Sequence, residues 1–256
     1  MKLFISSLEL GMQYLKPPDT NTLYWQKLKY LLSSFAYLKK KSQSDFIMPL
    51  VEKANQNNNF MLDSGAFSFM NGKQISKKDM DYYVDEYIDF INANNINLFI
   101  EADIDAVFGY DAALQYRKKI ESSTGKQCIP VWHKSRGIQA WKDICEEYSY
   151  IAIGGFVIKE IKPNEFDQAK NLVRYARKRG VKVHGLGYTG NDLRSWPFYS
   201  IDSSTWSVGQ RFGNAAQFKN GKIRQITKKH QRAKIAEIVE NNLTEWIKYQ
   251  HYIDGK

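Results

Sequence analysis

Short apolar runs recur along the chain and alternate with segments whose apolar residues follow a helical spacing. Several runs lie roughly 30 residues apart, which leaves room for the crossover helix that parallel strands require. Seven or eight such units favour a single-domain (β/α)8 TIM-like barrel over residues 1–256. A doubly wound nucleotide-binding sheet fits less well, because no GxGxxG motif follows the first run. The runs expected to form strands are residues 2–6, 60–65, 97–105, 127–133, 150–155, 182–188 and 199–204.

Other segments carry helix or turn signals. Residues 22–39 have apolar side chains around successive helical turns and are predicted to form one helix. Ser76 and Asp79 have the spacing of a capping box, which indicates a helix that begins at Ser76. Further expected elements are a helix around 110–122, a hairpin over 217–226 with Asn220-Gly221 at its turn, and a last helix over 228–250.

The composition is that of a globular protein. The chain is 43% hydrophobic and 25% charged, which supplies an ample core. Its longest apolar runs are interrupted by carboxylates and fall short of the roughly 20 residues that span a bilayer. The first residues lack the apolar stretch of a secretory signal, so a cytoplasmic location is the default expectation. Cys128 and Cys145 have no metal-site spacing and are expected to be core thiols.

The charge balance favours a polyanionic partner. Lys and Arg total 37 against 27 Asp and Glu, a net charge of +10, and basic residues gather at 39–41, 174–180 and 228–234. Nucleic acid is the preferred partner, with phosphorylated small molecules or plain solubility as the alternatives. The residues expected to contact a nucleic-acid backbone are Arg177, Arg179, Lys228, Lys229 and Arg232.

Polar residues and glycines stand where the expected strands end. In a parallel barrel these positions converge on the face that carries active sites, which predicts an enzyme. Paired carboxylates suit glycosyl chemistry, in which one attacks the anomeric carbon and the other transfers protons. Strand-end glycines let a flat ligand lie against bare backbone. The residues concerned are Asp63, Ser64, Gly65, Asp103, Asp105, His133, Gly154, Gly155, Gly185, Gly187, Asp202 and Ser203.

No metal centre is expected from the sequence. The chain has two cysteines and four histidines without a ligand-like cluster. Two carboxylates with His133 are only a weak alternative as ligands for a divalent ion.

Four motifs in order resemble those of the tRNA-guanine transglycosylases. "LDSGAFS" at 62–68 is similar to their Asp-Ser-Gly-Gly-Phe-Gln signature, and "YIAIGGFVIKE" at 150–160 to their Gly-Gly-x-x-x-x-Glu segment. "VHGLGYTG" at 183–190 resembles their Gly-x-Gly strand end. "SIDSSTW" at 200–206 falls where the family carries its nucleophilic aspartate. The resemblance covers about three-fifths of the chain, residues 60 to 206.

The resemblance implies a role for each matching residue. Asp202 would be the nucleophile that forms a covalent intermediate with C1′, and Asp63 the general acid and base. Asp103 would read the guanine edge, with Asp105 as its rival, and His133 stands where the family has a glutamine that contacts the base. The remaining residues implied to bind substrate are Ser64, Gly65, Gly154, Gly155, Phe156, Glu160, Gly185 and Gly187.

The departures from the family pattern modify the expected substrate. Ala66 and Ser68 replace a glycine and a glutamine of the signature, and the chain lacks the cysteines of the family's C-terminal zinc subdomain. A compact zinc-free member most resembles the DNA 7-deazaguanine transglycosylases of phages and bacterial islands (DpdA-type). That resemblance implies exchange of guanine in DNA for a base such as 7-cyano-7-deazaguanine, in the cytoplasm of a bacterium or an infected host, with no other cofactor.

A DNA transglycosylase would act on a flipped or single-stranded nucleotide. Aromatic residues are candidates for gripping bases, with core packing as the alternative reading: Trp132, Trp196, Phe198, Tyr199 and Trp206. Other functions left open are a tRNA or RNA guanine transglycosylase, a barrel enzyme acting on a free nucleoside or sugar phosphate, and a binding module without activity. The need for an accessory protein and the oligomeric state also stay open.

Overall fold

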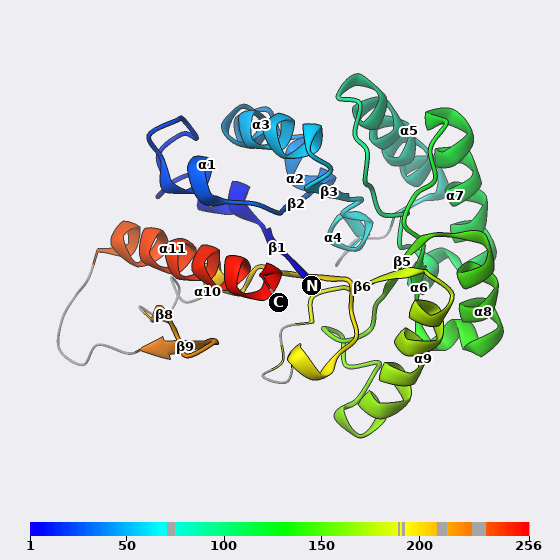
Figure 1. The fold of residues 1–256 in the computed structure, drawn as a ribbon. Coiled ribbons are helices and arrows are strands. Elements are labelled where there is room, and N and C mark those ends of the chain that lie inside the picture. Colours follow the sequence, from blue (N-terminus) through cyan, green and yellow to red (C-terminus); the bar gives the residue numbers. More distant parts are fainter. Residues whose placement is uncertain (71–74, 189, 191–192, 209–213, 227–233, 256) are drawn as a thin grey trace.

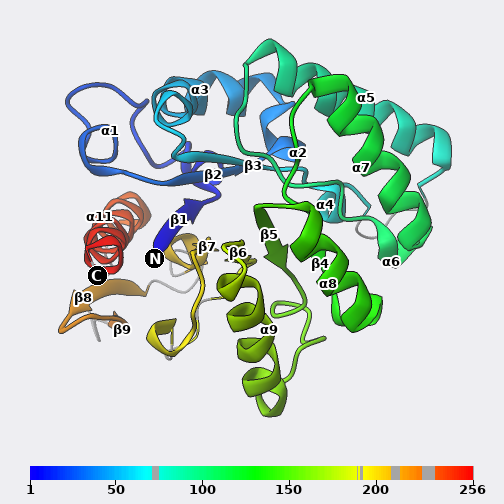
Figure 2. The same ribbon diagram turned by 45° about the vertical axis from the view of Figure 1, so that its right-hand side comes forward.

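The computed structural model describes the whole chain except residues 71–74, 189, 191–192, 209–213, 227–233 and 256. Its centre is a curled, all-parallel seven-stranded sheet in the order β3-β2-β1-β7-β6-β5-β4. Figures 1 and 2 show helices packed around the outside of this sheet. The strands are β1 (Lys2–Ser6), β2 (Leu31–Ser34), β3 (Phe60–Asp63), β4 (Val131–Trp132), β5 (Tyr150–Ile153), β6 (Lys182–Gly185) and β7 (Ser200–Ser203).

Helices connect the strands and lie mostly on the outer face of the sheet. None of those in the described part of the chain is both long and apolar enough to cross a bilayer. The α-helices are α1 (Leu23–Lys27), α2 (Phe35–Leu38), α3 (Lys41–Gln56), α4 (Ala66–Met70), α5 (Lys77–Ala93), α6 (Asp105–Phe108), α7 (Tyr110–Thr124), α8 (Gly137–Glu147), α9 (Phe166–Lys178), α10 (Thr205–Val208) and α11 (Ile235–Asp254). The 3-10 turns are η1 (Leu8–Gly11), η2 (Lys134–Arg136), η3 (Pro163–Glu165) and η4 (Leu193–Ser195).

The prediction of a closed eight-stranded (β/α)8 barrel is wrong, because the sheet is open and has seven strands with β3 and β4 at its edges. The run 97–105, expected as a strand, makes only isolated bridges, Leu62 with Phe99 and Ile100 with Ile129. The ladder does not continue beyond them because a side chain takes the place of the backbone. Val131 N donates to Glu101 Oε1 at 2.7 Å. The first amide of β4 is therefore bound to a carboxylate side chain and not to the backbone of a neighbouring strand.

Residues 22–39 do not form the single helix that was predicted. They form α1, then β2, then α2. β2 is buried along its whole length between β1 and β3, so strand pairing overrides the helical spacing of its leucines. The expected strand at 127–133 is also reduced to Val131–Trp132, since Pro130 before it has no N–H to give to a neighbouring strand.

The local signals were read correctly at three places. Ser76 and Asp79 make both hydrogen bonds of a capping box at the start of α5. The Asn220-Gly221 turn joins β8 (Ala215–Lys219) to β9 (Lys222–Ile226) as an antiparallel hairpin. A last helix was predicted over 228–250, and the structure has one, α11, over Ile235–Asp254. Residues 228–233 of the predicted range lie outside the described residues.

Two apolar clusters hold the sheet in place. Alternate strand residues such as Leu3 and Ile5 pack outward under the helices, where Cys128 and Cys145 are also buried as free thiols. The residues between them point inward and form a second cluster around Phe4, Met61 and Val131. The interior of the curled sheet is therefore packed, which leaves the ends of the strands as the places for ligands.

α11 ties the ends of the chain together. Figure 1 shows it beside β1 and above the β8–β9 hairpin. The fully buried Gln250 donates through Nε2 to Leu3 O at 2.7 Å and Tyr30 O at 2.8 Å, and its Oε1 accepts from Lys29 N at 2.8 Å. One amide side chain thereby completes the hydrogen bonding of β1 and of the residues that lead into β2.

Candidate active site

Asp202 is held at the carboxyl end of the sheet by donors from two neighbouring elements. Its Oδ1 accepts from Gly187 N at 2.7 Å, and its Oδ2 accepts from Ser6 Oγ at 3.4 Å. The ring of His184 lies with Nε2 3.3 Å from Oδ1, while its Nδ1 lies 2.7 Å from Ser200 Oγ. These contacts fix the direction of a side chain that is 14% exposed.

Two glycines at and just after the end of β6 serve this arrangement in different ways. Gly187 has φ +64, which turns its N–H toward Asp202, and a Cβ there would lie 2.5 Å from Val157 Cγ2. A Cβ on Gly185 would meet the ring of Phe198 at 2.8 Å. Gly187 therefore contacts the candidate nucleophile, whereas Gly185 permits close packing.

Asp63 ends β3, directly beside Ser34 of β2. Burial, with further contributions from the charges of Asp202 and Asp103, raises its pKa to about 7. Asp63 is thus in electrostatic reach of both other aspartates, although the three come from different parts of the chain. A carboxyl group with this pKa exchanges a proton near neutral pH.

Ser64 and Gly65 shape the turn that follows Asp63. Ser64 is buried, and its carbonyl accepts from Tyr83 Oη at 2.6 Å. Gly65 has φ +67, and a Cβ there would lie 2.3 Å from Ser34 Oγ. Both residues predicted to bind substrate therefore hold the backbone of the turn in place.

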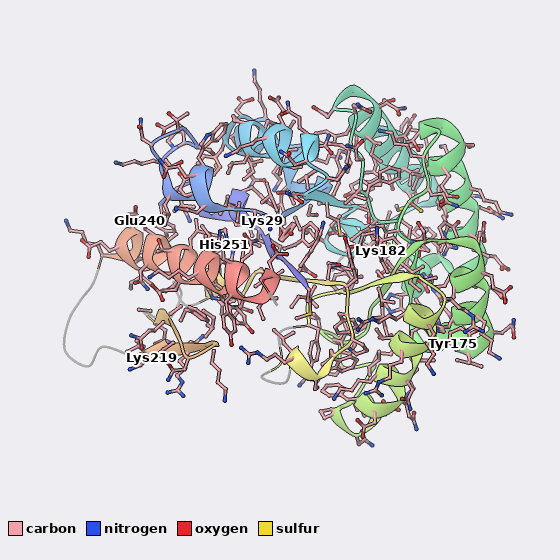
Figure 3. The ribbon with its side chains drawn as sticks, in the orientation of Figure 1. Lys29, Tyr175, Lys182, Lys219, Glu240 and His251 are labelled. Atoms are coloured by element: carbon pink, nitrogen blue, oxygen red, sulfur yellow. The ribbon has the colours of Figure 1, made fainter. Side chains whose placement is uncertain are left out.

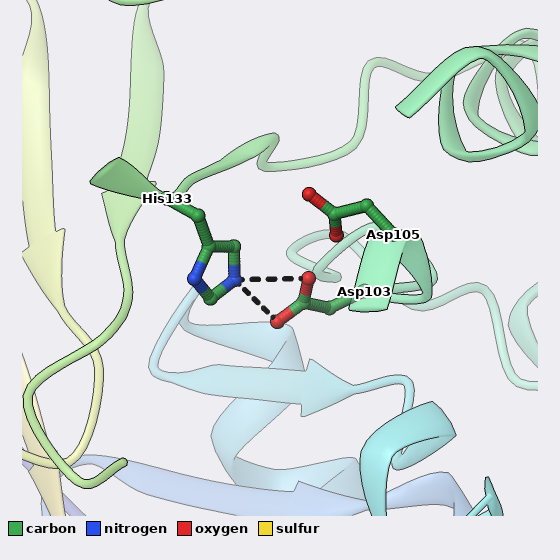
Figure 4. Close-up of side chains that lie close together, drawn as sticks. All are labelled: Asp103, Asp105 and His133. Carbon is green, nitrogen blue, oxygen red and sulfur yellow. Dashed lines mark hydrogen bonds and ion pairs between the residues drawn. The ribbon is translucent and has the colours of Figure 1, made fainter. Parts of the chain in front are cut away.

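His133 bridges two carboxylates, as Figure 4 shows in part. Its Nε2 lies 2.9 Å from Asp103 Oδ2, and its Nδ1 lies 3.0 Å from Glu160 Oε2. Burial lowers the pKa of His133, but hydrogen bonds to Asp103 and Glu160 and the charge of Asp105 outweigh it and raise the value to about 9. The ring is accordingly an imidazolium near neutral pH, and both of its N–H groups donate.

Asp105 faces a different partner from Asp103. Arg136 Nε donates to Asp105 Oδ2 at 2.6 Å, and burial of Asp105 is outweighed by this guanidinium, which lowers the pKa of Asp105 to about 2. Arg136 Nη1 also lies 3.0 Å from Glu101 Oε1, and Arg117 Nε lies 2.6 Å from Glu101 Oε2. Of the two rivals for reading a base, Asp103 is the one whose charge acts on Asp63.

Asp103, Asp105 and His133 each bring a potential metal-ligand atom within 4.8 Å of the others. The cationic neighbours oppose a divalent ion there. Arg136 lies 2.6 Å from Asp105 and 3.6 Å from Asp103, and a metal ligand histidine must be deprotonated. The arrangement fits an internal network of ion pairs better than a metal centre.

The segment after β5 is a rigid support beside this network. A Cβ on Gly154 would lie 2.7 Å from His133 Cε1, and one on Gly155 would lie 2.9 Å from Glu160 Oε2. Glu160 Oε1 accepts from Ser135 N at 2.8 Å. The side chain of Phe156 packs against Tyr188, Trp196, Phe198 and Phe166, which anchors the segment.

Of the predicted nucleic-acid contacts, the two that the structure describes lie away from the aspartates. Arg177 and Arg179 lie at and just beyond the end of α9, which runs to the opposite, amino end of the sheet, and the guanidinium of Arg179 lies 3.6 Å from the ring centroid of Tyr175. Lys228, Lys229 and Arg232 lie outside the described residues.

The predicted base-gripping aromatics are largely core residues. Trp132, Trp196, Phe198 and Trp206 are each 5% exposed or less, and Tyr199 is half-buried. The Trp206 Nε1 donates to Ser6 O at 2.7 Å. Packing of the fold therefore accounts for four of these five rings.

Sequence reasoning missed four residues of the site. His184 is at an inward-facing position of β6, opposite Ala152 of β5, so strand alternation was an available signal. Arg136 and Glu101 had none, because they are distant in sequence. Glu9, in η1, is fully buried, and Ser33 Oγ donates to its Oε2 at 3.1 Å. Burial raises the pKa of Glu9 to about 7, with a small contribution from Asp63.

Comparison with known proteins does not place the chain. No protein-family model matches the sequence, and no curated protein matches it at a significant level.

Proposed function

We propose that this protein is a base-exchange transglycosylase that replaces guanine in DNA with a 7-deazaguanine base. The observation that carries the proposal is the pairing of a fixed carboxylate with a proton-exchanging one at the same end of the sheet. Asp202 is oriented by Gly187 N and Ser6 Oγ. Asp63, whose pKa is about 7, is near enough for the charge of Asp202 to act on it.

The chemistry would run as a double displacement. An oxygen of Asp202 attacks C1′ of the nucleotide as the bond from C1′ to the guanine nitrogen breaks, and protonated Asp63 gives its proton to the departing base. The incoming base then loses its ring N–H proton to Asp63 as its nitrogen attacks C1′ and displaces Asp202. Two inversions give net retention, and Asp63 ends protonated as it began.

Asp103 is the group proposed to read the base. Guanine and a 7-deazaguanine share the same edge of N–H donors, so one carboxylate acceptor serves the leaving and the entering base. His133 and Arg136 hold Asp103 from two sides, with His133 Nε2 at 2.9 Å and Arg136 Nη2 at 3.6 Å. Burial raises the pKa of Asp103, and the hydrogen bond and charge of His133 oppose that rise.

The test is incorporation of labelled guanine, or of 7-cyano-7-deazaguanine, into duplex DNA, single-stranded DNA and tRNA. We expect incorporation into DNA, and loss by at least about 1,000-fold in Asp202→Asn because no covalent intermediate forms. Asp143→Asn is the matched control, since Asp143 is exposed on α8 and its loss changes the same charge.

A second readout follows the intermediate itself. Wild-type protein incubated with DNA and quenched in denaturant should carry a covalently attached strand, and Asp202→Asn should not. Incorporation into tRNA alone would favour the RNA transglycosylase. The absence of both incorporation and adduct with all nucleic acids would refute base exchange.

A further inference from the structure

A second candidate site lies at the opposite end of the sheet. A cavity of about 690 Å³ opens at the starts of β1, β6 and β7. Lys2 and Lys182 are the first residues of β1 and β6, whereas Asp202 and Asp63 lie near or at the ends of β7 and β3. Because all these strands are parallel, this cavity and the candidate active site are on opposite sides of the packed interior.

The cavity is positively charged. Its described lining includes the cations Lys2, Arg177, Lys182 and Arg194 and a single carboxylate, Asp254. Asp254 is already paired with Lys29 and accepts from Tyr30 Oη at 2.7 Å. None of the four lining cations forms an ion pair with a described residue, so their charge is available to a ligand.

Aromatic rings, in place of carboxylates, hold three of these cations. Lys2 Nζ lies 4.9 Å from the ring centroid of Tyr30 and 5.5 Å from that of Tyr199. Lys182 Nζ lies 5.1 Å from the same Tyr199 centroid. The Arg194 guanidinium lies 4.6 Å from the Tyr252 ring. Such contacts orient a cation without neutralising it, which suits the capture of an anion.

The rest of the lining is apolar. The wall is formed by Val181, Leu193, Pro197, Phe198 and Ile253. The volume of the cavity falls within the range of roughly 300–1,000 Å³ that is typical of small-ligand pockets. A small inorganic anion would leave this wall in contact with water. A ligand with a phosphate at one end and a flat apolar body at the other would cover the cations and the wall together.

We propose that this cavity binds a nucleotide, with its phosphate on Lys2, Lys182 and Arg194 and its base against the apolar wall. The site is separate from Asp63 and Asp202 and does not depend on the activity proposed for them. A free mononucleotide and the phosphorylated end of a strand present the same chemistry, and the experiment below separates them.

The experiment is equilibrium binding measured by calorimetry with guanosine monophosphate, adenosine monophosphate, guanosine and inorganic phosphate. The variant is Lys182→Gln with Arg194→Gln, and both side chains are exposed, so the fold is expected to persist. The control is Lys142→Gln with Lys219→Gln, which removes the same charge from exposed positions elsewhere. Figure 3 labels Lys182 and, on the β8–β9 hairpin, Lys219.

We expect a mononucleotide to bind the wild type and the control equally within twofold, and the Lys182/Arg194 variant at least tenfold more weakly. Asp202→Asn should bind it like the wild type, which distinguishes this site from the active site. A hexanucleotide with and without a 5′-phosphate forms the second arm. Phosphate-dependent binding of the hexanucleotide would assign the site to strand ends, and binding of the mononucleotide alone to a free nucleotide.

Three results would overturn the proposal. Guanosine could bind as tightly as its monophosphate, which would remove the phosphate from recognition. Inorganic phosphate could match the nucleotide in affinity, which would remove the base. Unchanged affinity in the Lys182/Arg194 variant, with the folded state verified by circular dichroism, would place the nucleotide elsewhere on the molecule.

Discussion

The two ends of the sheet treat their charges in opposite ways. At the carboxyl end, Arg136 is 2% exposed and lies within 3.0 Å of Glu101 and 2.6 Å of Asp105, and His133 bridges Asp103 and Glu160. At the amino end, exposed Lys182 rests on the ring of Tyr199 and has no described carboxylate partner. Buried charges that are paired hold each other in position. Cations that rest on aromatic rings keep their charge available to a ligand. The same loss of one positive charge should therefore have very different consequences at the two ends.

The largest effect is expected for Arg136→Met. The substitution keeps the bulk but leaves Glu101 and Asp105 buried without this partner, which should cost about 3–5 kcal/mol of unfolding free energy. For a chain of this size that corresponds to a fall in Tm of roughly 10 °C. Urea and thermal unfolding measure it, and a loss below about 1 kcal/mol would mean that the network does not hold the carboxyl end together.

Asp63→Asn should change the pH dependence of stability. The pKa of Asp63 is raised from the usual 3.8 to about 7 by burial, Asp202 and Asp103, so the native state keeps a proton that the unfolded state releases. The contribution of Asp63 to stability is full below pH 3.8 and declines as the pH rises through 7. The variant, which cannot ionise, should thus exceed the wild type at pH 8.5 by about 2–4 kcal/mol and by less at pH 5. Equal gains at both pH values would contradict the raised pKa.

His133→Gln should lose stability, with the same pH sense as for Asp63, because both pKa values are raised in the native state. The pKa of His133 is raised to about 9, so its contribution is complete below pH 6.5 and is lost as the pH rises through 9. We expect a destabilisation of about 2 kcal/mol at pH 6 that largely disappears at pH 10. His133 stands where the transglycosylases that the sequence resembles have a glutamine, so the proposed exchange activity should survive. A penalty independent of pH would indicate packing instead of charge.

The smallest effect is expected for Lys182→Gln, at the amino end. An exposed lysine without an ion pair should change the free energy of unfolding by less than about 0.5 kcal/mol. Compared with Arg136→Met in the same buffer, it isolates the difference between the two ends. A loss approaching that of Arg136→Met would mean that the contact between Lys182 and Tyr199 is structural.

Some features of the site follow from local pattern. Asp63, His133 and Asp202 each come at or directly after a short apolar run, and the parallel arrangement carries them to one end of the sheet. The capping box of Ser76 and the turn at Asn220-Gly221 depend only on neighbours in sequence, which is why they could be predicted.

Other features depend on contacts between distant residues. The apolar residues of β2 have the spacing of a helix, so the strand was not predicted. It forms because β2 pairs with β1 and β3. The run 97–105 looked like a strand, but Glu101 binds Val131 N and two arginines, so pairing stops. Arg136 was also missed because its contacts are distant in sequence. Nothing near it in the chain indicates that three carboxylates lie around it.

Gln250 has a consequence for the order in which the molecule can assemble. Its contacts with Leu3 and Tyr30 join residues 247 and 220 positions apart in the chain. During synthesis, the carbonyl of Leu3 must wait for its side-chain partner until residue 250 has been made, and β7 beside β1 is also late. Long-range closure of this kind slows folding and exposes early segments to association. β1 is therefore among the last strands to become native, so nascent chains that stall before residue 250 would be candidates for chaperone binding.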